Sequence, residues 1–118
     1  MNNMKLQPEY YNYILYGTKR IEIRLYDDKR KNIKIGDTIR FFKEPNLNES
    51  FDALVIGLLR YNSFSDMFKD FDIEVLADKS MTKDELISDL EEFYSKDKQK
   101  EYSVLGIRIE LKEQNTSI

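Results

Sequence analysis

The sequence predicts an α+β domain built as a small mixed or antiparallel β-barrel, with short helices at the openings of the barrel. Alternating or continuous apolar runs predict four strands, at residues 20–25, 38–43, 51–61 and 103–111. Start and stop signals predict helices at 8–16 and 82–94. The early strands lie too close in sequence for the long crossovers of a parallel βαβ sheet, which favours the barrel.

The first helix begins at Pro8, a residue suited to the first helical position. We expect it to end before Gly17, with this glycine in the left-handed conformation that often follows a helix. The helical spacing predicts an inward stripe of Tyr10, Tyr13 and Ile14.

A turn signal and the pattern of apolar residues predict the next two strands. Gly36 and Asp37 form a turn signal before the strand at 38–43. The run at 51–61 is apolar on both parities, as in a strand covered on both faces. Gly57 within it predicts a bend or a bulge.

The second half of the chain contains two capping patterns. Ser63 begins a short helix, and Thr82 with Glu85 forms a capping box for the helix at 82–94. The helical spacing predicts that the inward residues of that helix are Leu86, Leu90 and Phe93. Its acidic outer face is typical of a solvated surface. We expect a polar connection at 96–102, a single domain over residues 1–112 and a disordered tail at 113–118.

Composition excludes several classes of chemistry. The 118 residues include no Cys and no His, so a thiolate nucleophile, an imidazole base and a zinc finger are impossible. We expect no metal and no cofactor, and any catalysis would depend on carboxylates, Lys, Tyr, Ser or Thr. No apolar run approaches the ~20 residues of a membrane span and no leader pattern is present, so we expect a cytoplasmic protein without a membrane partner.

Charge is distributed unevenly along the chain. Residues 1–45 contain ten Lys and Arg against six Asp and Glu, whereas residues 46–118 contain nine against sixteen. The acidic pI of about 5.1 argues against broad non-specific nucleic-acid binding. A local positive patch in the first half could still attract a phosphate group.

A charged row stands out in the segment GTKRIEIRL. Arg20, Glu22 and Arg24 share one face of the predicted strand, with Lys19 at its entrance. The simplest interpretation is a cross-strand ladder of salt bridges, which contributes little if it is exposed. Parity places Lys19 on the opposite face unless the strand begins after it.

Gly17, Lys19, Glu22 and Arg24 form the pattern G-x-K-x-x-E-x-R. This pattern after a short helix, followed by IKIGDTIRF, resembles the activating signal cointegrator homology (ASCH) domain, a branch of the PUA-like fold. The similarity covers most of the chain and is greatest to small stand-alone prokaryotic members. It implies a β-barrel with a cleft beside the motif strand, and a role in RNA metabolism or nucleotide binding.

One branch of that family resembles amidohydrolases that remove the acetyl group from N4-acetylcytidine. The resemblance implies a Lys at position 19, which this chain has. That branch has Thr where this chain has Glu22, and Glu where it has Lys79, with Asp78 one residue away.

Three functional hypotheses follow. The preferred one is a cleft that binds a nucleotide or single-stranded RNA. In it, Lys19 and Arg24 would contact phosphate, Glu22 would contact a base edge, and Tyr16 would stack on a base. Arg20 is a further candidate ligand-binding residue. The second is an enzyme with Lys19 and Glu22 as catalytic residues, either an amidohydrolase on an acylated nucleoside or a weak metal-independent ribonuclease. The third is a protein-interaction domain that uses its acidic helix. Oligomeric state is not predicted.

Overall fold

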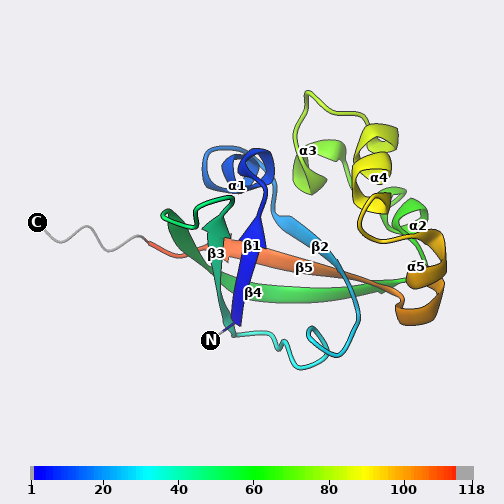
Figure 1. Ribbon diagram of the computed structural model, residues 1–118, viewed down its shortest axis with the longest axis horizontal. Coiled ribbons are helices and arrows are strands. Elements are labelled where there is room, and N and C mark those ends of the chain that lie inside the picture. The colour runs from blue at the N-terminus through cyan, green and yellow to red at the C-terminus, as the bar shows by residue number, and fades with distance from the viewer. Residues whose placement is uncertain (1, 114–118) are drawn as a thin grey trace, which may run out of the picture.

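The computed structural model describes residues 2–113, which form one five-stranded sheet with helices around it (Figure 1). The strands are β1 (Asn2–Leu6), β2 (Ile21–Leu25), β3 (Thr38–Lys43), β4 (Ser50–Tyr61) and β5 (Val104–Leu111). Their spatial order is β1-β3-β4-β5-β2, with β1 parallel to β3 and all other pairs antiparallel. The sheet curls into a half-barrel, which confirms the predicted α+β class and the PUA-like barrel.

Five short helices complete the fold of the described residues. They are α1 (Pro8–Leu15), α2 (Phe64–Phe68), α3 (Ile73–Leu76), α4 (Lys83–Glu91) and α5 (Lys96–Tyr102). Figure 1 shows α1 beside β1, while the other four helices gather beyond β2. The two edge strands of the sheet are therefore each flanked by helical structure.

The core lies on both faces of the sheet. One cluster packs α1 and β1 against β3, β4 and β5, and the other packs the helices α2 to α4 against β2. Ile21, Ile23 and Leu25 are all buried, as their alternation predicts. β4 contributes to both clusters, which agrees with its apolar residues on both parities.

Several predicted details are confirmed. β3 has the expected bounds and follows Gly36, whose φ of 97° favours glycine. The register of β4 against β5 shifts between Val55 and Gly57, so this glycine does mark an irregularity. Thr82 and Glu85 form both hydrogen bonds of the capping box at the start of α4.

Two elements, β1 and α3, are absent from the sequence-based prediction. The sequence pattern predicts no strand at β1, yet Met4 and Leu6 are buried and β1 pairs with β3. The chain between these parallel strands runs through α1 and β2, which is long enough for a crossover. The short helix α3 was also not predicted.

The predicted polar connection at 96–102 is wrong, because this segment is the helix α5. Ser95 caps it by accepting a hydrogen bond from the backbone N–H of Lys98. Gln99 anchors it from a buried position, where its side chain accepts from the backbone N–H of Phe64 at 3.1 Å and donates to Glu91 and to the Tyr94 carbonyl. A lone buried glutamine gives no periodic apolar signal.

The inward stripe of α1 also differs from the prediction. Tyr11 and Ile14 are the buried residues, whereas Tyr10 and Tyr13 are half-buried. Gly17 does not adopt a positive φ. Its importance is steric, because a Cβ atom there would lie 2.7 Å from the Tyr13 carbonyl oxygen.

Two expectations concern what lies outside this core. The predicted tail at 113–118 lies outside the described residues except for Glu113. Within residues 2–113, none of the helices has the length and the apolar character that crossing a bilayer requires.

Candidate functional site

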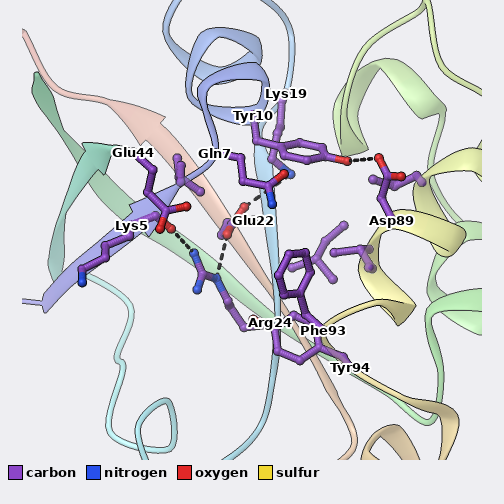
Figure 2. A pocket seen from close by; sticks show the side chains of 14 residues that line it. Lys5, Gln7, Tyr10, Lys19, Glu22, Arg24, Glu44, Asp89, Phe93 and Tyr94 are labelled. Atoms are coloured by element: carbon purple, nitrogen blue, oxygen red, sulfur yellow. Dashed lines mark hydrogen bonds and ion pairs between the residues drawn. The ribbon is translucent and has the colours of Figure 1, made fainter. Parts of the chain in front are cut away.

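A pocket of about 270 Å³ opens between the two edge strands of the half-barrel. β1 and α1 form one wall, β2 forms the floor, and α4 with the residues after it forms the other wall (Figure 2). The residues that line it include Gln7, Tyr10, Lys19, Glu22, Arg24, Glu44, Asp89, Phe93 and Tyr94. This volume is at the small end of ligand pockets and suits one small ligand.

Lys19 lies at the inner end of the pocket floor. Because β2 begins at Ile21, Lys19 lies before the strand and its side chain does not follow the alternation of the strand residues. It therefore reaches the same pocket as Glu22. Its ammonium group donates to the carbonyl oxygens of Ile21 at 2.5 Å and of Leu76 at 2.8 Å, and lies 3.5 Å from the Glu22 carboxylate. Only 2% of the residue is exposed.

The surroundings of Lys19 act on its charge in opposite directions. Burial lowers the pKa of Lys19, while the nearby Glu22 carboxylate raises it, and the net shift is downward. The three groups around the nitrogen are all acceptors, which matches the three N–H donors of an ammonium ion. We therefore assign Lys19 the protonated form in the absence of a ligand.

Glu22 is the buried carboxylate that joins the two cations. One oxygen faces Lys19, and the other accepts a hydrogen bond of 2.7 Å from the Nε of Arg24. Burial raises the pKa of Glu22, but the charges of Arg24 and Lys19 together outweigh it and the net shift is downward. Glu22 is ionised at neutral pH.

Arg24 links the two edge strands, β1 and β2, through its hydrogen bonds. Its Nη2 donates to the carbonyl oxygen of Lys5 in β1 at 3.0 Å, while its Nε holds Glu22 in β2. Burial lowers the pKa of Arg24, but Glu22 and Tyr94 outweigh that effect and raise it. A guanidinium has five N–H donors, so these bonds leave donors for a ligand.

The Lys19–Glu22–Arg24 cluster has a net charge of +1, because one carboxylate serves two cations. All three side chains are largely removed from water, with exposed fractions of 2%, 7% and 13%. Charges in such a site interact more strongly than they would in water. The cluster therefore favours an anionic group or a strong acceptor atom in the pocket.

The rim of the pocket has a different character. The Tyr10 hydroxyl donates to the Asp89 carboxylate at 2.8 Å, which links α1 to α4 across the opening (Figure 2). Burial and this hydrogen bond raise the pKa of Tyr10. Glu44 and Gln7 lie on the wall opposite α4. The rim thus presents acceptor groups above a positively charged floor.

Phe93 is the residue that the sequence reasoning misassigned. The helical spacing predicts a core position, but α4 ends at Glu91, and Phe93 is 56% exposed at the pocket. Its ring contacts that of Tyr94 at a centroid distance of 6.4 Å. An exposed aromatic ring beside a polar cavity is a candidate stacking surface.

Two predicted site residues do not line the pocket. Tyr16 is 79% exposed at the C-cap of α1. Arg20 donates to the carbonyl oxygens of Ile14, Gly17 and Lys19, so it stabilises the end of α1 and the turn into β2. The structure thus brings together Lys19, Glu22 and Arg24, but not Arg20 and Tyr16.

Comparison with known proteins gives consistent matches. The family model of the ASCH domain matches residues 4–113. The crystal structure of the archaeal hypothetical protein PH0355 matches with a TM-score of 0.81 and 35% identity, over 93% of this chain and 97% of that one. The NMR structure of protein PF0455 from Pyrococcus furiosus matches with a TM-score of 0.76 and 34% identity, over 96% and 98%.

A more distant match shows likeness of fold alone. The crystal structure of ASCH from Zymomonas mobilis matches with a TM-score of 0.57 and 11% identity, over 94% of this chain and 66% of that one. No curated protein matches the sequence.

Proposed function

The chain belongs to the ASCH domain family, and from that premise we propose that its pocket binds a nucleotide, either free or within single-stranded RNA. ASCH domains have a PUA-like fold, which is associated with RNA binding. The observation that carries the proposal is the buried cluster of Lys19, Glu22 and Arg24 at the floor of a single pocket.

The floor offers both donors and acceptors to a nucleobase. The free N–H groups of Arg24 can donate to a base carbonyl or a ring nitrogen. The Glu22 carboxylate has about four lone-pair sites. Lys19 and Arg24 occupy only some of them, so others can accept a hydrogen bond from an exocyclic amino group. A base edge that alternates donors and acceptors therefore fits this floor, and its acceptor atoms would face the positive charge of the cluster.

Lys19 acts as a support for Glu22 in this proposal. Its N–H groups already face two carbonyl oxygens and a carboxylate, so it has no free donor for a ligand. Its role is to hold Glu22 ionised and in place. Phe93 supplies the stacking surface at the rim.

Titration of the protein with the four ribonucleosides and their 5′-monophosphates, by calorimetry at low salt, tests the proposal. We expect saturable binding of at least one of them with one site per chain. Arg24→Lys should weaken it by roughly tenfold, because an ammonium cannot reproduce the planar pair of donors. The control is Arg40→Lys, since Arg40 pairs with Asp52 and does not line the pocket.

Two results would count against the proposal. One is the absence of binding by any of the eight compounds to the folded protein. The other is an equal loss of affinity in Arg24→Lys and Arg40→Lys, which would mean that binding does not depend on the guanidinium in the pocket.

A second candidate function is hydrolysis, favoured by one observation. The lowered pKa of buried Lys19 is what a lysine nucleophile or base requires. The substrate would be N4-acetylcytidine or a related acylated nucleoside, or the chain would cleave RNA without a metal by means of Glu22. The acceptors around Lys19 stabilise its ammonium form and favour binding instead.

Incubation with N4-acetylcytidine and with a short single-stranded RNA tests the enzymatic alternative. Release of cytidine that is lost in Lys19→Met would establish the amidohydrolase. RNA cleavage that is lost in Glu22→Gln would establish the ribonuclease. If the wild-type protein consumes neither substrate, this alternative is to be abandoned.

A further inference from the structure

A second polar hollow lies at the end of β4, beside α2 and the residue that precedes β5. It has a volume of about 240 Å³ and is lined by Arg60, Tyr61, Asn62, Asp66 and Ser103. Arg60 is the last residue but one of β4 and is exposed to solvent. No hypothesis above assigns a role to this hollow.

The strand register relates this hollow to the pocket. Arg24 in β2 and Arg60 in β4 both pair with Leu105 of the central strand β5. Residues directly opposite one another share a face of the sheet, so the two arginines lie on the same face. With neighbouring strands about 4.8 Å apart, their Cα atoms are separated by roughly 10 Å.

Arg60 is held in place without being neutralised. Its Nε and Nη2 donate to the hydroxyl oxygen of Ser103 at 3.2 and 2.8 Å. The Cζ of Arg60 lies 3.5 Å from the centroid of the Tyr26 ring. Tyr26 follows Arg24 by two residues along the chain. In residues 2–113 it forms no ion pair with a carboxylate. An arginine that is oriented in this way but remains unpaired is well suited to bind a phosphate group.

We propose that Arg60 binds the phosphodiester group of a nucleotide adjacent to the one in the pocket. The inference rests on the proposed function, because it requires a base in the pocket. It narrows the ligand from a nucleotide to a single-stranded RNA segment of at least two nucleotides. Affinity then has two parts, a base contact at Glu22 and Arg24 and a phosphate contact at Arg60.

The experiment compares the four ribonucleosides with the homotrinucleotides AAA, CCC, GGG and UUU. For the preferred base, we expect the trinucleotide to bind about tenfold more tightly than the nucleoside. Arg60→Gln should remove this gain and leave nucleoside binding unchanged. It should also reduce the slope of log affinity against log salt by about 0.7, as expected for one phosphate contact on a single strand.

The matched control is Arg108→Gln. Arg108 is also an exposed arginine of the sheet, but it lies three residues from Leu105 on β5 and therefore on the opposite face. This variant should keep the trinucleotide gain. Arg60→Lys retains the charge and should keep part of the salt dependence, and thermal unfolding of each variant checks its fold.

The outcomes separate this inference from the proposed function. A trinucleotide gain that persists in Arg60→Gln, or no gain in the wild-type protein, would overturn the phosphate site while nucleoside binding still supported the pocket. If neither nucleosides nor trinucleotides bind, the proposed function fails and the phosphate site fails with it.

Discussion

Glu22→Gln is expected to lower the free energy of unfolding by about 3–5 kcal/mol, because it leaves two buried cations without a carboxylate. The change keeps the shape of the side chain, removes its charge and replaces one acceptor oxygen by an NH2 donor that would face a cation. The loss would be a large part of the total stability of a domain of this size. Urea unfolding at neutral pH measures it.

Asp52→Asn is the matched control for this prediction. It also removes a carboxylate that accepts a 2.8 Å hydrogen bond from an arginine, but Arg40 and Asp52 are partly exposed. We expect a loss of less than about 1 kcal/mol there. Equal losses in the two variants would mean that the Lys19–Glu22–Arg24 cluster is no more dehydrated than a surface ion pair.

The pH dependence of the Glu22 effect follows from the sign of its shift. The folded-state pKa of Glu22 lies below its ordinary value of 4.5. The stability that ionised Glu22 contributes is therefore fully present above about pH 4.5 and is lost as the pH falls through its folded-state pKa. The stability difference between wild type and Glu22→Gln should be constant from neutrality down to about pH 5 and should shrink at lower pH.

Phe93→Ala should weaken nucleotide binding by roughly ten- to a hundredfold, which is the range measured for loss of one base–aromatic stack. The ring is 56% exposed, so its removal should change the free energy of unfolding by less than about 1 kcal/mol. Calorimetric titration and thermal unfolding of the same variant separate the two effects.

Tyr16→Ala is the control for the stacking prediction. Tyr16 is an even more exposed aromatic residue and was the sequence-based candidate for stacking, but it does not line the pocket. We expect its removal to leave affinity unchanged. A loss of binding in Tyr16→Ala together with normal binding in Phe93→Ala would place the ligand outside the pocket.

Local sequence signals predicted much of the fold correctly. The alternation of Ile21, Ile23 and Leu25, the turn at Gly36 and the capping box at Thr82 each act within a few residues. Such signals are strong because each element is determined by interactions between residues that are close in the sequence. β1 and α5 lacked them, since each is stabilised by distant partners: β3 for the former, and Phe64 through Gln99 for the latter.

The candidate site was predictable only in part. Parity placed Glu22 and Arg24 on one face, and the motif added Lys19, which the late start of β2 allows into the same pocket. Phe93 was assigned to the core because helical spacing was extended past Glu91, where α4 ends. The phosphate contact that we propose for Arg60 was not predictable, because the argument for it depends on the register of three strands.

The central claim is that a nucleobase lies on the Glu22–Arg24 floor beneath Phe93. A crystal structure of the protein with the nucleotide that binds most tightly tests it directly. The account predicts density for a base within hydrogen-bond distance of Arg24 and Glu22, with its ring facing Phe93. A nucleotide bound at another surface, with this pocket occupied only by solvent, would contradict it.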